Sequence, residues 1–174
     1  MSVYSKQIGF GGGCHWCTEA VFSSLAGIHS VEQGFIKSQP PDDQYSEAIL
    51  VHHEEKQIPL DKLIEIHLCT HASTSLHSMR TKYRSAIYVN NIAMAKRCHS
   101  ILNSLQAQFE KPLVTRVLET VHFKSSAESY IDYYATNPNK PFCITYIEPK
   151  LAILRRDFKL FLKTGPSQAT ENAR

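Results

Sequence analysis

The sequence predicts an α+β fold, a two-layer sandwich in which helices cover a mixed β-sheet, with a ferredoxin-like βαββαβ core and helical additions at the C-terminus. Two observations lead to this prediction. Stretches with the alternation of strands and stretches with the apolar spacing of helices follow one another in the order β-α-β-β-α-β-α-β. The 174 residues contain no internal repeat and no linker-like boundary. We therefore expect a single domain over 1–162 and a disordered polar tail over 163–174.

The first half of the chain supplies most of this core. A glycine-rich segment separates the first strand from the first helix, and Gly27 is placed to end that helix. Pro59 stands at the opening of the next helix. The following loop, over 71–82, is long and polar, a combination typical of functional loops. The predicted elements of this half are strands over 7–10, 29–36 and 46–53 and helices over 14–26 and 60–69.

The second half adds a further strand-helix-strand unit and then helices. Asn90 or Asn91 is expected to cap the longest helix, and Pro112 separates that helix from a strand rich in β-branched residues. The predicted elements of this half are strands over 83–89 and 113–118 and helices over 91–109, 127–136 and 148–162.

The composition is that of a soluble globular protein, with 43% hydrophobic and 20% charged residues. A net charge of +3, without a stripe of basic and aromatic residues, does not indicate nucleic-acid binding. No apolar stretch predicts a signal peptide or a membrane span. Five cysteines without a disulfide-framework spacing favour a reducing cytoplasm. We expect a cytoplasmic monomer that binds neither nucleic acid nor membranes.

The segment Gly11-Gly12-Gly13-Cys14-His15-Trp16-Cys17-Thr18-Glu19 organises the rest of the chain. Its glycines lie between a predicted strand and a predicted helix, where backbone N–H groups are free to face a ligand. Cys14 is expected at the helix start, where unpaired N–H groups and the helix dipole favour a thiolate over a thiol. A lowered pKa makes a cysteine nucleophilic near neutral pH. The segment therefore predicts a reactive-thiol site.

Four segments of the chain are informative together, because no single one of them is specific for a protein family but their combination in this order is. They are Gly12-Gly13-Cys14-His15-Trp16, Tyr45-Ser46-Glu47, Thr81-Lys82-Tyr83-Arg84-Ser85-Ala86-Ile87-Tyr88, and Asn137-Pro138-Asn139-Lys140-Pro141-Phe142-Cys143 followed by Pro149-Lys150. In this order the set resembles the A-type peptide methionine sulfoxide reductase family. The resemblance covers most of residues 7–160.

The resemblance implies a role for each of four residues. Cys14 would attack the sulfur of a sulfoxide, and Glu47 would be the acid aimed at the sulfoxide oxygen, which requires burial of its carboxyl group. Tyr83 would hydrogen-bond the same oxygen, and Trp16 would form a wall of the pocket for the S-methyl group. After the attack the oxygen remains on Cys14 as a sulfenic acid, which a second thiol converts to a disulfide with loss of water.

The chain also departs from the family at the expected substrate pocket. The family has Phe where this chain has His15, so a titratable ring replaces an apolar wall. Phe35 stands in place of a tyrosine and lacks its hydroxyl group. Ser78 stands in place of an aspartate that grips the substrate backbone. These changes predict a divergent member with altered substrate preference or a different role. With an altered preference, small sulfoxides should compete well with peptides.

Two cysteines are candidates for the second thiol. Cys17 stands three residues after Cys14, which places the two sulfurs within bridging reach at a helix start and resembles a thiol-disulfide exchange motif. Cys143 is the alternative, because family members often carry a cysteine in their C-terminal segment. Cys69 and Cys98 fall within helical patterns and are expected to be core thiols.

Three hypotheses follow from these residues. The first is reduction of methionine-S-sulfoxide, free, in peptides or in a related small sulfoxide, with no bound cofactor and with an external thiol, a thioredoxin-like protein or a small thiol, as reductant. The second is a general thiol-disulfide oxidoreductase that uses Cys14 and Cys17. The third is a non-catalytic sensor, with zinc held by these cysteines and histidines, for which one Cys-x-x-Cys is weak support.

Overall fold

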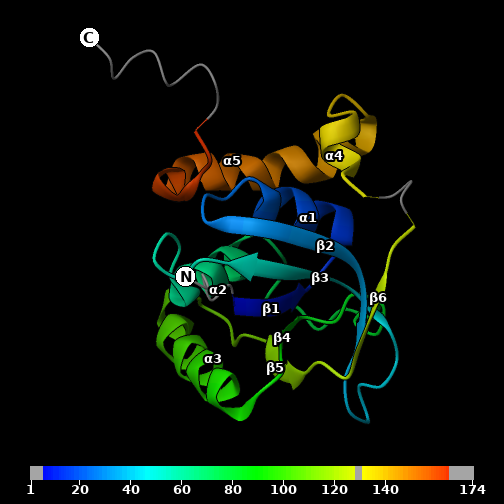
Figure 1. Cartoon of the computed structure of the whole chain (residues 1–174), viewed down its shortest axis with the longest axis vertical. Coiled ribbons are helices and arrows are strands. Elements are labelled where there is room, and N and C mark those ends of the chain that lie inside the picture. Colours follow the sequence, from blue (N-terminus) through cyan, green and yellow to red (C-terminus); the bar gives the residue numbers. More distant parts are fainter. Residues whose placement is uncertain (1–5, 128–130, 165–174) are drawn as a thin grey trace, which may run out of the picture.

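The computed structural model of the chain describes residues 6–127 and 131–164. Its strands are β1 (Lys6–Gly11), β2 (Ile28–Lys37), β3 (Ser46–His53), β4 (Ala86–Val89), β5 (Arg116–Glu119) and β6 (His122–Ser125). In this part of the chain they form one sheet in the order β5-β4-β1-β3-β2-β6 (Figure 1). β4 and β5 are parallel and the other neighbours antiparallel, so the sheet is mixed, as predicted.

The helices lie against this sheet and complete the predicted core. The α-helices are α1 (His15–Ser23), α2 (Leu60–Cys69), α3 (Ile92–Leu105), α4 (Tyr133–Thr136) and α5 (Glu148–Asp157), with a π-helix η3 (Cys143–Ile147) and 3₁₀ turns η1 (Gln106–Gln108) and η4 (Lys159–Phe161). The order β1-α1-β2-β3-α2-β4, with the central strands in the order β4-β1-β3-β2, confirms the ferredoxin-like core. No described helix combines the length and the hydropathy that crossing a membrane requires.

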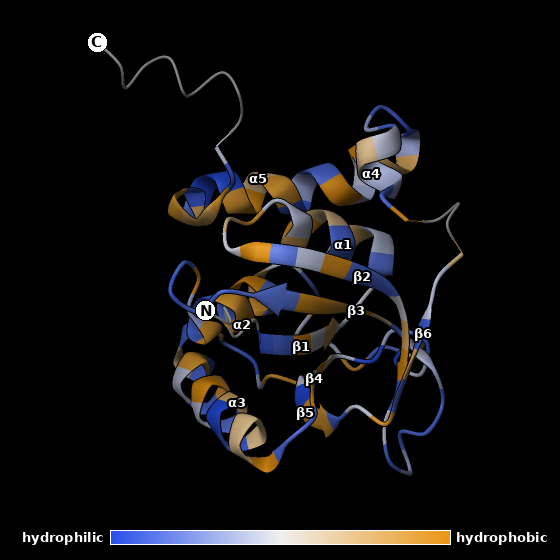
Figure 2. Cartoon of the chain, in the orientation of Figure 1, coloured by the Kyte–Doolittle hydropathy of each residue, from blue (hydrophilic) through white to orange (hydrophobic). Residues whose placement is uncertain are grey.

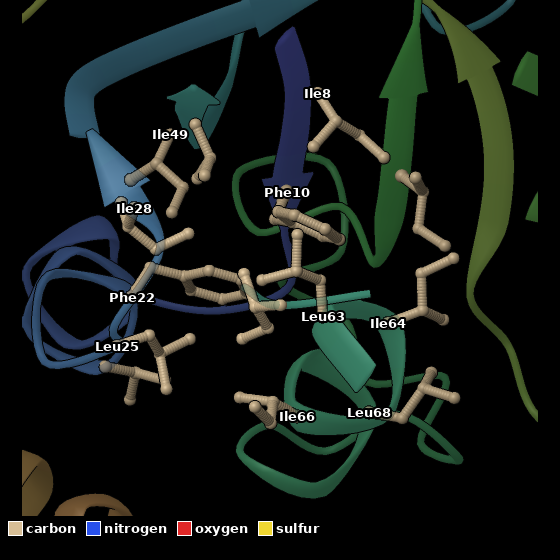
Figure 3. Close-up of a cluster of buried hydrophobic side chains, with 14 of the residues drawn as sticks. Ile8, Phe10, Phe22, Leu25, Ile28, Ile49, Leu63, Ile64, Ile66 and Leu68 are labelled. Atoms are coloured by element: carbon tan, nitrogen blue, oxygen red, sulfur yellow. The ribbon is translucent and has the colours of Figure 1, made fainter. Parts of the chain in front are cut away.

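Alternation along the strands separates two faces of the sheet. On β3, Ile49 and Val51 belong to the large cluster that the helices cover, whereas Leu50 belongs to a smaller cluster on the other face. Phe10 of β1 stacks on Phe22 of α1 with 4.7 Å between ring centroids, which joins strand and helix at the centre of the large cluster (Figure 3). Hydrophobic and hydrophilic positions alternate along α2, α3 and α5, as expected for helices with one buried side (Figure 2).

Some boundaries differ from the sequence prediction. The predicted strand 83–89 begins only at Ala86, because β1, its neighbour, ends at Gly11 and leaves 83–85 without a strand to pair with. β6 was not predicted, since three of its four residues are polar and exposed at the sheet edge and only Phe123 packs on the core. The helix predicted over 127–136 is confined to α4, although 128–130 lie outside the described residues. The last helix ends at Asp157, and most of the predicted tail lies outside the described residues.

A buried polar layer lies under the glycine-rich turn that follows β1. His67 Nε2 donates to the carbonyl oxygen of Gly11 at 2.8 Å, and the Arg80 guanidinium donates to the carbonyl oxygen of Gly12 at 3.0 Å. His71 donates through Nδ1 to the His67 carbonyl oxygen, and its Nε2 lies 2.8 Å from Ser85 Oγ. These bonds satisfy the carbonyl groups of the turn, so α2 and the loop after it fix the backbone that leads into α1.

Two neighbouring glycines give a matched test of this layer. A Cβ at Gly12 would clash with the His71 ring, whereas a Cβ at Gly13 would meet no atom within 4 Å. We expect Gly12→Ala to lower the free energy of unfolding by about 1–3 kcal/mol, because the ring and its hydrogen bonds have to move. Gly13→Ala should stay within about 0.5 kcal/mol of the wild type. Urea denaturation measures both, and equal midpoints would contradict the close packing of His71 on the turn.

Candidate active site

Cys14 is the residue at which the glycine-rich turn becomes a helix. It is the N-cap of α1, and its carbonyl oxygen accepts from the backbone N–H groups of Cys17 and Thr18 at 3.1 and 3.2 Å. Its side chain is half-buried, at the end of the helix where the dipole is positive. The sequence prediction of a cysteine at a helix start is therefore confirmed.

The thiols of Cys14 and Cys17 form an unequal pair. A hydrogen bond from the Cys17 thiol lowers the pKa of Cys14 against the opposing effect of burial, and backbone N–H groups of α1 lower it further. The same hydrogen bond strongly raises the pKa of Cys17, and burial and the charge of Cys14 add to it. Cys14 is thus the more readily ionised thiol of the pair, and Cys17 is its hydrogen-bond donor.

Cys143 is a third thiol whose charge acts on Cys17. It is fully buried at the start of η3, and its charge is among the causes that raise the pKa of Cys17. Cys14 and Cys143, the other two cysteines named from the sequence, therefore both act on Cys17. Cys98 is also buried and Cys69 half-buried, both within helices as expected.

Glu47 reaches the helix start from the second residue of β3. It has the same parity along the strand as Ile49, so its side chain is on the helix-covered face of the sheet, and it is 8% exposed. Its Oε2 accepts from the backbone N–H of His15 at 3.0 Å. Its charge opposes ionisation of Cys14. The burial expected from the sequence is confirmed, and the carboxyl group faces the first turn of α1.

His15 is held between α1 and β2. Its Nδ1 lies 2.9 Å from the carbonyl oxygen of Gly34, and because a carbonyl only accepts, Nδ1 carries a hydrogen. Its Nε2 lies 3.9 Å from Glu47 Oε2. The ring packs on Phe35, which is the residue directly opposite Glu47 on the neighbouring strand, with 5.1 Å between ring centroids. The substituted positions His15 and Phe35 thus surround the carboxyl group.

Trp16 faces the C-terminal segment. Its ring stacks on Tyr133 at 4.1 Å between centroids and meets the edge of Phe142 at 5.3 Å. Lys140 Nζ lies 4.3 Å from the centroid of Tyr133. One turn later on α1, Glu19 accepts from backbone N–H groups at the start of α4, and burial raises its pKa to about 7. Trp16 is therefore one layer of an aromatic wall built from three segments.

The loop between α2 and β4 contributes Tyr83 and a residue that the sequence interpretation had not singled out. Lys82 Nζ lies 3.9 Å from Glu47 Oε1 and 5.0 Å from the centroid of the Tyr83 ring. A hydrogen bond to Tyr83 raises the pKa of Lys82. Tyr83 lies in the loop and not in the predicted strand, while Ser78 is exposed in the same loop.

Lys150 is the second residue whose role sequence reasoning missed. Its ammonium group donates to the Thr70 carbonyl oxygen, and its charge acts on Cys14 and Cys17. The sequence analysis noted the Pro149-Lys150 pair, but the sequence does not reveal that Lys150 comes near Cys14 and Cys17, more than 130 positions earlier. Among the described residues, no group of three His, Cys, Asp or Glu side chains is arranged to hold a metal ion, which the zinc hypothesis would need.

Comparison with known proteins identifies the family. The family described as peptide methionine sulfoxide reductase matches residues 6–160. The peptide methionine sulfoxide reductase MsrA of Deinococcus radiodurans is 31% identical over 87% of this chain and 81% of its own length. That of Trichodesmium erythraeum is 29% identical over 85% and 93%, respectively.

Solved structures agree on the fold. Reduced Mxr1 of Saccharomyces cerevisiae matches 82% of this chain and 91% of its own, with a TM-score of 0.70 at 24% identity. Methionine sulfoxide reductase A of Corynebacterium diphtheriae matches 77% and 76%, with a TM-score of 0.66 at 20% identity. The chain belongs to the peptide methionine sulfoxide reductase family and is an oxidoreductase that reduces methionine sulfoxide.

Proposed function

We propose that the chain reduces methionine-S-sulfoxide, free, in peptides or in a related small sulfoxide, by attack of the Cys14 thiolate on sulfur. The observation that carries this proposal is the position of Cys14, a thiol with a lowered pKa, at the start of α1 next to a buried carboxyl group that is bonded to the same helix turn. A thiolate supplies the nucleophile, and a carboxyl group supplies a proton to the oxygen, without which the sulfoxide sulfur is a poor electrophile.

The reaction transfers one oxygen atom. The Cys14 sulfur bonds to the sulfoxide sulfur, and Glu47 protonates the oxygen. The oxygen then moves to the Cys14 sulfur as the substrate S–O bond and the new S–S bond break, which leaves a sulfenic acid on Cys14 and releases a thioether. Tyr83 would hydrogen-bond the oxygen. Trp16 would form the wall for the S-methyl group, since its stacking on Tyr133 fixes an apolar face at the helix start. His15 and Phe35 would line the side of the same pocket that lies next to Glu47.

The resolving thiol and the reductant complete the cycle. Cys17 is hydrogen-bonded to Cys14 and is proposed as the resolving cysteine, with Cys143 as the alternative. Mxr1 of Saccharomyces cerevisiae has been solved in complex with Trx2. We propose a thioredoxin-like protein or a small thiol as the reductant here, no bound cofactor, and action as a cytoplasmic monomer.

A panel of S- and R-sulfoxides with dithiothreitol as reductant tests the proposal. We expect turnover of the S-epimers only, because a fixed nucleophile and a fixed acid select one configuration at sulfur. Small methyl sulfoxides should compete well with peptides, since Ser78 has no charge to hold a peptide amine.

Cys14→Ser should abolish turnover. Disulfide exchange without reduction of any sulfoxide would favour the thiol-disulfide oxidoreductase hypothesis, which the paired thiols alone would satisfy.

Substitution of the acid gives a second test. Glu47→Gln keeps an acceptor for the His15 N–H group but has no proton to give at neutral pH. We expect kcat to fall by roughly 10²- to 10⁴-fold, the usual contribution of general acid catalysis. Glu54→Gln, which changes a carboxyl group in the turn after β3, is the control and should leave kcat unchanged. Single-turnover rates equal to wild type in Glu47→Gln would assign Glu47 a structural role.

Mass spectrometry identifies the resolving cysteine. After one equivalent of a methyl sulfoxide without reductant, digested wild-type protein should contain a Cys14–Cys17 disulfide, because the two residues are one helical turn apart. Cys17→Ser should accumulate the Cys14 sulfenic acid, and Cys69→Ser, a control thiol in α2, should behave as wild type. A dominant Cys14–Cys143 disulfide in wild type would transfer the role to Cys143.

A further inference from the structure

The hydrogen bond between Cys17 and Cys14 favours attack of Cys14 on the sulfoxide, but it disfavours the later attack of Cys17 on the Cys14 sulfenic acid. While Cys14 is a thiolate, Cys17 donates its proton to it, and the pKa of Cys17 is strongly raised. The thiolate is the form of a cysteine that attacks a sulfenic acid. Oxidation of Cys14 to a neutral sulfenic acid removes the charge and the strong acceptor. The reactivity of Cys17 then depends on the charged and titratable groups around it other than Cys14.

Those surroundings contain a cation from the C-terminal helix. Lys150, the third residue of α5, is half-buried, and its ammonium group donates to the carbonyl oxygen of Thr70 at the C-terminal end of α2. The negative end of a helix dipole holds a cation at that place. α5 lies along α1 on the same side of the sheet (Figure 1). Thr70 is followed by His71, whose ring packs against Gly12 in the turn that leads into Cys14, so the Lys150 ammonium group is tied to the support of that turn. Burial lowers the pKa of Lys150, and the charges of Cys17 and Cys14 act in the opposite direction.

The other groups around Cys17 do not favour its thiolate. Cys143 and burial raise its pKa, whereas Lys150 lowers it. Burial holds the pKa of His71 at about 3 and that of His67 well below its usual range, so both rings are neutral. Glu47 and Lys82 face each other, with Lys82 over the Tyr83 ring, and neither is among the main causes that shift the pKa of Cys17.

We propose that Lys150 is the positioning residue for the resolving step: its ammonium group, fixed on the end of α2, stabilises the Cys17 thiolate as Cys17 attacks the sulfenic acid on Cys14. This inference rests on the proposed function, with Cys17 as the resolving thiol. Cys17 loses its proton, its sulfur bonds to the Cys14 sulfur, and the S–OH bond breaks. The departing hydroxide and the proton form water, so a thiol is oxidised and a sulfenic acid is reduced to one disulfide.

Rapid-quench kinetics of the Lys150→Met variant test this role. The sulfenic acid is formed either with one equivalent of a methyl sulfoxide or with one equivalent of hydrogen peroxide, and its decay to the disulfide is followed by dimedone trapping and mass spectrometry. We expect Lys150→Met to slow this decay roughly tenfold at pH 7, since loss of one partly buried charge shifts a neighbouring pKa by about one pH unit. Thioether formation, the first step, should slow much less.

The pH dependence separates an electrostatic role from a packing role. Removal of the cation raises the pKa of Cys17, so the resolving rate in Lys150→Met should rise at a pH about one unit higher than in wild type. Lys150→Arg keeps the charge and should restore most of the rate. Lys159→Met, at an exposed lysine of η4, should match wild type.

Three results would overturn the proposal. They are an unchanged resolving rate in Lys150→Met, a slower rate with an unshifted pH profile, and a loss in Lys150→Arg as large as that in Lys150→Met. The peroxide arm keeps this test separate from the proposed function. If the sulfoxide gives no thioether, the proposed function fails, while peroxide still forms the sulfenic acid on which Lys150 is tested.

Discussion

The hydrogen bond from the backbone N–H of His15 to Glu47 Oε2 is the contact on which the site depends. It joins the first residue of α1 to the second residue of β3, and a carboxylate at the N-terminus of a helix also satisfies one of its unpaired donors. Because Glu47 is fixed by strand register and buried on the helix-covered face, α1 can begin only where Cys14 lies beside it. One bond thereby positions Cys14 and the Glu47 carboxyl group relative to each other.

The polar layer under the turn complements this bond from the other side. His67 and Arg80 hold the carbonyl groups of Gly11 and Gly12, while the same guanidinium donates to the carbonyl oxygen of Tyr83 at 2.9 Å. The loop that carries Tyr83 and Lys82 is consequently tied to the turn that carries Cys14. The two halves of the site share one backbone support, although more than sixty residues separate them in the chain.

Local patterns in the sequence predicted what depends on local chemistry. The glycine-rich turn and the helix start at Cys14 follow from residue types, and the burial of Glu47 follows from the role that the family resemblance implies. Tyr83 was assigned to a strand because alternation cannot reveal that β1, its pairing partner, ends at Gly11. The places of Lys82 and Lys150 depend on tertiary packing and have no sequence signal of their own. The family, and with it the roles expected of the site residues, was inferred from the order of the four sequence segments.

Trp16 has a consequence for how this protein is observed. It is the only tryptophan of the chain, and its indole ring lies between the reactive helix turn and the Tyr133 and Phe142 rings. Thiolates and disulfides quench indole emission by accepting or donating an electron over short distances. The intrinsic fluorescence of the whole protein is therefore a local signal from the wall of its own redox centre, which makes the wild-type chain an optical reporter of its oxidation state without any label.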